Sequence, residues 1–239
     1  MFGDSLLADF LTGGFSLYFL MFIFYSFLGW IMEVIFTRIT EGKWVNRGFL
    51  IGPICPIYGV GLLLITNLLD GYTKKPLVLF ILAIFICMVL EYFTSYIMEK
   101  LFNARWWDYS DMKYNINGRI CLETTIPFGL GGLFIMYVIY PLSFKVLDMF
   151  SYNTLVILAF ILLILFLVDV IISFNAISKI KGYFLDKYKD DTEEVNKSVR
   201  DYLINLNPLT KRLMESFPKF RVRIKKIADD IKEKVIGKK

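Results

Sequence analysis

The sequence of 239 residues contains no histidine. Histidine is the commonest general base near neutral pH and the commonest metal ligand, so its absence removes both roles. Cysteine is scarce, and Cys55, Cys87 and Cys121 all lie within or at the edge of apolar segments. Neither a disulfide framework nor a thiolate metal cluster has a natural place there. We therefore expect no metal and no cofactor, and we favour a role other than catalysis.

Nucleotide-binding loops are missing as well. No GxxxxGK[ST] sequence occurs, and no GxGxxG follows a strand-like segment. Such loops hold phosphate groups with their backbone amides. Any nucleotide that this protein uses would have to bind to another subunit.

Charged residues are absent from long stretches of the chain. Hydrophobic residues make up 56% of it and charged residues 21%. A stretch of about 20 apolar residues can cross about 30 Å of hydrocarbon, because a helix rises about 1.5 Å per residue. Five stretches qualify, at 15–36, 49–69, 76–98, 121–144 and 153–174. They predict an all-α, polytopic membrane helix bundle of about five transmembrane helices.

Two segments, 43–63 and 115–134, resemble each other. In both, a polar Asn/Arg turn leads into an apolar helix that contains Pro and Gly. A constant offset pairs Asn46 with Asn117, Pro56 with Pro127, Gly61 with Gly132 and Leu62 with Leu133, and it brings Arg47 within one residue of Arg119. We predict a duplicated helical hairpin with halves at about 15–69 and 76–144, followed by an unpaired fifth span at 153–174. Residues 1–174 then form the transmembrane domain and 175–239 a basic amphipathic cytoplasmic tail.

Proline and glycine interrupt the second and fourth spans. Pro53 and Pro56 lie in the second span and Pro127 in the fourth, so we expect each helix to be kinked or unwound near its cytoplasmic end. Non-helical backbone at that depth is tolerated only where it is buried in protein or lines a wet cavity. Interrupted spans in corresponding positions of two halves indicate the binding site of a transporter.

Several carboxylates lie within or at the ends of the predicted spans: Glu33, Glu91, Glu123 and Asp169. A carboxylate near the bilayer centre costs about 2.5–3.5 kcal/mol, so these groups should face one another. Arg47 and Arg119 are their expected partners, because a guanidinium stays charged and can bind a carboxylate or a phosphate with two hydrogen bonds. Two interpretations stay open for each arginine, namely an ion pair that holds the bundle together and a contact with a substrate.

The candidate substrate-binding or cavity residues are therefore Glu33, Asn46, Arg47, Glu91, Asn117, Arg119 and Glu123. A further candidate is the cytoplasmic loop that contains Trp106, Trp107, Asp108 and Tyr109. Aromatic residues of this kind anchor a chain at the membrane interface. A gating or docking role is the second interpretation of this loop.

Basic residues are distributed unequally between the two sides of the predicted membrane. One side has only Lys74, Lys75 and Lys145, whereas the other has the two Asn/Arg turns and a tail with 17 of the 27 basic residues. Basic residues are retained in the cytoplasm. We predict a multi-pass plasma-membrane protein with its N-terminus outside and its C-terminus in the cytoplasm.

The end of the tail has the pattern of a basic amphipathic helix. After Pro218, apolar residues recur every three or four positions, at Phe220, Ile224, Ile227, Ile231 and Val235. Such a helix can lie on an anionic inner leaflet, or it can pack on a partner subunit or on residues 195–217. Membrane lipid accounts for the positive charge, so nucleic acid is not an expected partner.

The chain contains a series of short motifs in a fixed order. They are Gly29, Trp30 and Glu33, then 47–50 with Gly52 and Pro53, then 56–59 with Gly61, then 107–110, 115–120, Pro127 and Gly129. In these motifs, residues 16–170 resemble the bacterial "putative ABC-transporter permease" family of the CmpB-like, type IV kind. The resemblance implies a multispan, permease-like subunit. A separate ATPase subunit and a second copy of the chain are partners to test.

Three functions fit these observations. The favoured one is a transport subunit that moves a small anionic or zwitterionic solute through a polar intramembrane cavity. The first alternative is an intramembrane enzyme that acts on lipid-linked or phosphorylated substrates, with a carboxylate pair as acid and base and the arginines as phosphate clamps. The second alternative is a membrane scaffold that transports nothing.

Overall fold

The computed structural model describes residues 14–187 and 193–222, and this part of the chain is mainly helical. Its helices are α2 (Phe15–Glu41), α3 (Pro56–Leu69), α4 (Pro76–Phe102), α5 (Leu122–Phe134), α6 (Tyr140–Leu147), α7 (Tyr152–Lys187), α8 (Glu193–Leu206) and α9 (Pro208–Ser216). A 3-10 turn, η1 (Asp70–Tyr72), follows α3, and a π-helix, η2 (Ile135–Ile139), joins α5 to α6. The predicted all-α membrane helix bundle is confirmed.

Four very short strands complete the described structure. Strand β1 (Ala104–Arg105) pairs antiparallel with β4 (Arg221–Val222), and β2 (Asn115–Ile116) pairs antiparallel with β3 (Ile120–Cys121). The first pairing joins the loop after α4 to the last described residues of the tail. The second closes the hairpin that leads into α5.

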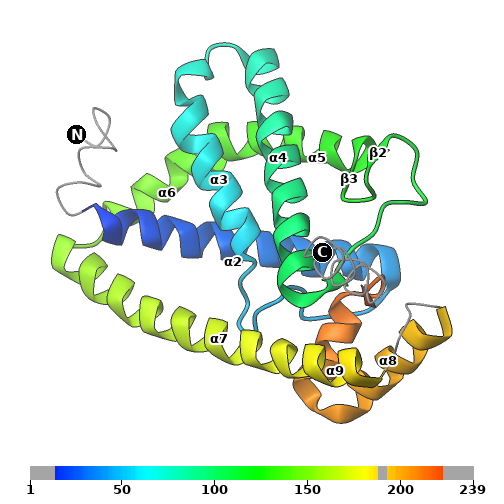
Figure 1. Ribbon diagram of the computed structural model, residues 1–239. Coiled ribbons are helices and arrows are strands. Elements are labelled where there is room, and N and C mark those ends of the chain that lie inside the picture. Colours follow the sequence, from blue (N-terminus) through cyan, green and yellow to red (C-terminus); the bar gives the residue numbers. More distant parts are fainter. Residues whose placement is uncertain (1–13, 188–192, 223–239) are drawn as a thin grey trace, which may run out of the picture.

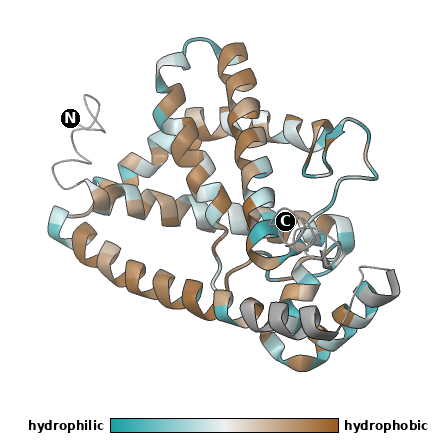
Figure 2. Ribbon diagram, in the orientation of Figure 1, coloured by the Kyte–Doolittle hydropathy of each residue, from teal (hydrophilic) through white to brown (hydrophobic). Residues whose placement is uncertain are grey.

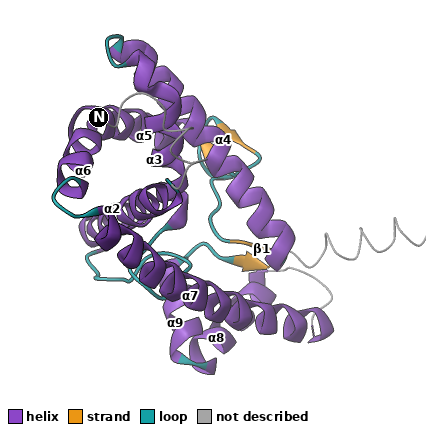
Figure 3. Cartoon of the chain, turned by 90° about the vertical axis from the view of Figure 1, so that its left-hand side faces the viewer, coloured by secondary structure: helices purple, strands orange, loops and turns teal. Residues whose placement is uncertain are grey.

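Two directions dominate the arrangement of the helices. Figure 1 shows α3 and α4 standing across α2, while α7 runs alongside α2. In Figure 3 the same crossing is seen from the side, with α8 and α9 beside the C-terminal part of α7. Hydrophobic residues cover most of α4 and the N-terminal part of α7 (Figure 2).

Four helical segments of the described chain are long and apolar enough to cross a membrane: Phe15–Glu41, Pro76–Phe102, Leu122–Leu147 and Tyr152–Ile177. The expected span at 49–69 is not among them, because its helix begins only at Pro56 and has 14 residues. Such a helix is about 21 Å long at 1.5 Å per residue, less than the hydrocarbon thickness. Four of the five expected spans are therefore single helices of full length, whereas the segment at 49–69 consists of irregular backbone followed by a short helix.

The segment before α3 is irregular, and side chains bind part of its backbone. Asp169 of α7 accepts hydrogen bonds from the amides of Ile51, at 2.8 Å, and Gly52, at 2.7 Å. Pro56 then occupies the first turn of α3, where its missing amide costs nothing. Unwound backbone is thus found at this end of the second predicted span, and it is packed against protein.

The fourth predicted span behaves differently. Pro127 lies inside α5, and the helix continues past it to Phe134. The amide that Pro127 lacks would have bonded the carbonyl of Glu123, which lies in the exposed first turn of α5. The irregular backbone in this span is η2, further along the chain. The expected break at Pro127 therefore does not occur, and the helix changes its winding at 135–139 instead.

Glycine allows close packing within each helical hairpin. A Cβ atom at Gly59 of α3 would lie 2.2 Å from the Ser26 hydroxyl and 2.6 Å from the Phe22 carbonyl oxygen. A Cβ atom at Gly129 of α5 would lie 2.6 Å from the Phe80 ring of α4. Small residues let helix backbones approach closely in membranes. The α2–α3 and α4–α5 contacts therefore depend on these two glycines.

The tail up to Phe220 packs onto the membrane-embedded part of the chain. Trp106 is buried and its ring lies 4.9 Å from that of Phe217 and 5.2 Å from that of Phe220. Trp106 is therefore not the membrane-interface anchor that was expected for a tryptophan in this loop, because the tail covers it. Phe220 belongs to this core, and the remaining apolar residues of the predicted amphipathic helix lie outside the described residues.

We predict that Gly59→Ala lowers the stability of the protein by about 1–3 kcal/mol, the usual cost of overpacking. The new methyl group would collide with the backbone of α2. Gly131→Ala is the matched control, since a Cβ atom there meets nothing within 4 Å. Thermal unfolding of the purified protein followed by tryptophan fluorescence measures the effect. Equal melting temperatures for the two variants would contradict the prediction.

Candidate functional site

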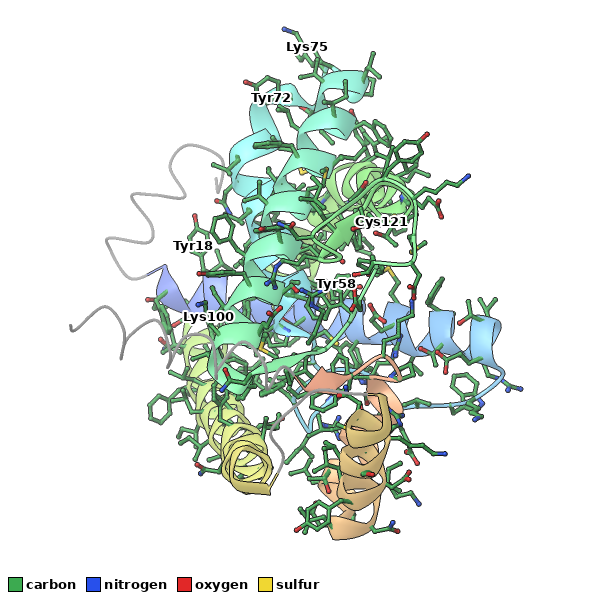
Figure 4. The ribbon with its side chains drawn as sticks, turned by 45° about the vertical axis from the view of Figure 1, so that its right-hand side comes forward. Tyr18, Tyr58, Tyr72, Lys75, Lys100 and Cys121 are labelled. Atoms are coloured by element: carbon green, nitrogen blue, oxygen red, sulfur yellow. The ribbon has the colours of Figure 1, made fainter. Side chains whose placement is uncertain are left out.

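The first polar cluster connects α2, α3 and the turn between them. Arg47 Nε lies 3.5 Å from Glu33 Oε2, and the Tyr58 hydroxyl donates a hydrogen bond to Glu33 Oε1. The side chains of Arg47 and Glu33 are 20% and 28% exposed. Figure 4 shows Tyr58 in the centre of the fold, far from Tyr72 and Lys75 at the tip of the α3–α4 hairpin. We call Glu33, Arg47 and Tyr58 the Glu33 cluster.

Asn46 shapes the turn that carries Arg47. Its side-chain oxygen accepts a hydrogen bond from Trp30 Nε1 at 2.7 Å, and its Nδ2 donates to the Ile51 carbonyl at 3.0 Å. Gly48 has a φ of +111°, which only glycine adopts readily. The turn can therefore fold back toward α2 and bring Arg47 to Glu33.

The tail holds this turn in place. Arg212 of α9 donates to the carbonyls of Asn46, Gly48 and Phe49, at 3.4, 3.4 and 3.1 Å. The Ser216 hydroxyl donates to the Asn46 carbonyl at 2.7 Å, and Arg47 donates to the Ser216 carbonyl. Burial lowers the pKa of Arg212, while the charge of nearby Asp169 raises it. The tail is thus part of the structure that positions Arg47.

The second polar cluster is more deeply buried. Glu99 Oε2 lies 2.9 Å from Arg119 NH2 and 3.2 Å from Arg105 Nε. Arg119 also donates to Ser95 Oγ at 3.2 Å, and its guanidinium lies over the rings of Tyr92 and Tyr96, at 5.7 and 5.5 Å. The side chains of Arg119 and Glu99 are each only 6% exposed. We call Glu99, Arg105 and Arg119 the Glu99 cluster.

The loop after α4 is held by its polar residues. Asp108 Oδ1 accepts from the amide and the hydroxyl of Ser110, at 3.0 and 2.6 Å, and lies 3.3 Å from Arg105 NH1. Burial raises the pKa of Asp108, but the bonds from Ser110 and the charge of Arg105 outweigh it, so the net pKa is lowered. Asp108 is therefore a carboxylate at neutral pH, and it orders the loop.

The neighbours of Asp108 face the helices. Trp107 Nε1 donates to the Arg119 carbonyl at 3.1 Å, and the Tyr109 hydroxyl donates to Glu91 Oε1 at 3.1 Å. Burial raises the pKa of Tyr109 above its usual range, which keeps the hydroxyl protonated as a donor. The loop residues chosen from the sequence thus connect Arg119 with Glu91.

The Glu33 cluster lies near Glu91 of α4. Glu33 is close enough to Glu91 for the two carboxylates to repel each other, and Tyr58 interacts electrostatically with both. Asn117 donates to the Tyr92 hydroxyl at 3.0 Å, beside Arg119. Glu123 is exposed at the start of α5 and makes no hydrogen bond or ion pair within the described residues. Of the candidate cavity residues, only Glu123 lies apart.

Several site residues were not among the candidates chosen from the sequence: Tyr58, Glu99, Arg105 and Arg212. Asp169 was one of the carboxylates expected to face each other, and it binds the amides of Ile51 and Gly52. Glu99 could have been chosen from the sequence, because it follows Glu91 and Ser95 at helical spacing on one face of α4. No sequence pattern indicated Arg212, since its contact with the turn at 46–49 joins segments more than 160 residues apart. Among the described residues, no three cysteine or carboxylate side chains converge as metal ligands.

Comparison with protein families gives a match over most of the membrane-embedded chain. Residues 20–174 match the model of the family described as "putative ABC-transporter type IV". The chain belongs to this family. The match includes the Glu33 and Glu99 clusters and ends before α8 and α9, so the family relationship covers the charged clusters but not the tail that packs on them. No curated protein and no solved structure matches the chain significantly.

We predict that Glu99→Gln costs about 3–5 kcal/mol of stability, as expected when one partner of a buried ion pair is removed. Both Arg105 and Arg119 would lose their shared counter-charge. Glu123→Gln, which changes an exposed glutamate on the neighbouring helix, should stay within about 0.5 kcal/mol of the parent. Melting temperatures in detergent test this, and a Glu99→Gln protein as stable as the Glu123→Gln control would contradict it.

Proposed function

We propose that this family member is a permease-like membrane subunit that binds a small zwitterionic or anionic solute at the Glu33 cluster. The solute moves through a polar intramembrane cavity formed between α2 and α4 and their following turns. The observation that carries the proposal is the contrast between the two ion pairs: Glu33 with Arg47 is partly exposed, whereas Glu99 with Arg119 is buried.

The Glu33–Arg47 pair has the geometry of an interaction that can open. Arg47 contacts Glu33 through a single nitrogen at 3.5 Å, and its guanidinium also donates to the backbone carbonyl of Ser216. Bidentate, short contacts are the strong form of this interaction. Arg119, in contrast, is surrounded by Glu99, Ser95 and two aromatic rings. We therefore assign solute contact to Arg47 and a structural role to Arg119.

The chemistry of the pair favours a zwitterion. A solute carboxylate or phosphate can take the place of Glu33 on Arg47, and a solute ammonium can take the place of Arg47 on Glu33. The exchange leaves no buried charge unpaired, which would cost several kcal/mol. A purely anionic solute would leave Glu33 with only the hydrogen bond from the Tyr58 hydroxyl.

The family description and the sequence both favour ATP hydrolysis by a separate subunit as the energy source. The family description names an ABC-transporter type, and the sequence has no phosphate-binding loop of its own. We propose that a separate ATPase subunit binds on the side of the membrane that carries α8 and α9.

We also propose that the two hairpins arose by duplication. Two structural similarities support this proposal. Cys55 and Cys121 are the residues before the first turns of α3 and α5, and each thiol contacts a carbonyl eight residues earlier. The packing glycines Gly59 and Gly129 meet Phe22 and Phe80, and in each half a glutamate follows that phenylalanine by eleven residues. Glu33 and Glu91 are therefore equivalent positions under this proposal.

The proposed topology places the N-terminus outside and the tail in the cytoplasm. Arg212 binds the turn at 46–49, and Lys219 donates to the Asp108 carbonyl at 3.2 Å, so both turns and the tail share one side. The excess of basic residues there favours the cytoplasm. Green fluorescent protein fused after Lys239 should fluoresce, and alkaline phosphatase inserted at Gly71 should be active. The opposite activities would reverse the topology.

We predict that Arg47→Ala weakens solute binding about 10- to 100-fold, the loss expected for one charge-assisted hydrogen bond of about 1.5–3 kcal/mol. The measurement is the rise in melting temperature of the purified protein with each of the twenty amino acids and with small phosphorylated amines. Arg47→Lys should retain part of the shift, and Glu33→Gln should lose it for zwitterions.

Arg38→Ala is the matched control. Arg38 lies at the exposed end of α2 and donates to the Gly42 carbonyl, away from Glu33. It should bind solute like the parent. If Arg47→Ala and Glu33→Gln keep the solute-induced shift, or if Arg38→Ala loses it to the same extent, the proposed site is wrong.

A further inference from the structure

Glu91 is the buried carboxylate of this region that has no counter-charge among the described residues. Glu33, Glu99 and Asp108 each have a guanidinium within 3.5 Å. Glu91 is only 7% exposed, and among the described residues its Oε1 accepts a hydrogen bond from Tyr109. The other oxygen, Oε2, is buried without a hydrogen-bond partner. An ionised carboxylate in this position would cost several kcal/mol.

Apart from the Tyr109 hydroxyl, which donates to Oε1, the groups that face Glu91 do not stabilise a negative charge there. Glu33 comes from α2 and Tyr58 from α3, Cys87 lies one turn earlier on α4, and Tyr109 comes from the loop with Thr124 of α5 behind it. These groups are neutral or acidic. A like charge nearby makes one of two carboxylates take up a proton. Arg47 lies 3.5 Å from Glu33, whereas Glu91 Oε2 has no partner, so the proton is assigned to Glu91.

We propose that Glu91 is a proton-binding site, a carboxylic acid that carries its proton on Oε2 at neutral pH. When the proton leaves, the O–H bond breaks, both electrons stay on Oε2, and water takes up the proton. Under this proposal the proton leaves on the Glu33 side of the site, because the Glu33 side chain is 28% exposed. Tyr109 continues to donate to Oε1 in both states.

Proton release follows from solute binding if the proposed function holds. A zwitterion on Arg47 would bring its ammonium group to Glu33 and thus close to Glu91. That positive charge would stabilise the ionised form of Glu91, so solute binding would release a proton. This linkage rests on the proposed function, whereas the protonation of Glu91 does not.

The test is the infrared spectrum of the full chain in lipid nanodiscs at pH 7. We expect a carbonyl band of a protonated carboxyl group in the parent protein that is lost in Glu91→Gln. Glu99→Gln is the matched control, since Glu99 lies on the same helix with similar burial but binds two arginines, and it should retain the band. No such band in the parent, or a band that persists in Glu91→Gln, would overturn the proposal.

A second measurement covers the case in which Glu99→Gln is too unstable to purify. The melting temperature of the parent should fall relative to that of Glu91→Gln as the pH rises from about 5 to 8. An unfolded glutamate ionises near pH 4.3, so folding must take up a proton over this range, and the folded-to-unfolded ratio falls about tenfold per pH unit. A constant difference would show that Glu91 is ionised and would overturn the proposal.

The two proposals can fail separately. A parent protein with the protonated band but without any solute-induced shift in melting temperature would leave the proton site intact and remove the solute site. A solute-induced shift without the band would remove the proton site alone.

Discussion

The need to pair acidic side chains on apolar helices explains most of the polar architecture of this protein. Glu33 on α2 and Glu99 on α4 lie on helices that are otherwise suited to lipid. Each is paired with an arginine from the following loop, and each loop folds back to make that contact. The backbone that permits this return includes Gly48, Asn117 and Gly118, all with positive φ. The loops are thus shaped by an electrostatic requirement, and the bundle's ends are ordered as a result.

The tail extends this order across the loops. Arg212 satisfies three carbonyls in the turn at 46–49, where no helix or strand supplies donors. Trp106 and Phe220 pack in one apolar core with residues of α8 and α9. Buried carbonyls without donors are costly, so the unwound segment before α3 and the tail stabilise each other. The described part of the tail is therefore a structural component of the membrane-embedded fold.

The two ion pairs are alike in chemistry but differ in environment. The Glu33–Arg47 pair is partly exposed and rests on one contact, whereas the Glu99–Arg119 pair is buried and lies beside aromatic rings. Glu91 of α4 is paired with neither arginine. The two pairs therefore differ in how tightly the surrounding protein holds them.

The sequence by itself determined the membrane class, most of the helices and the family, because hydrophobic run length and motif order are local properties. It also determined that arginines in two turns would meet acidic residues. Only the tertiary structure decided that Arg119 pairs with Glu99, that the second apolar run is helical only from Pro56, and that the tail buries Trp106. Each of these depends on distances between segments far apart in the chain. Asp169 and Arg212, which reach the backbone before α3 from two distant helices, are the physical reason that this segment could not be predicted from its own residues.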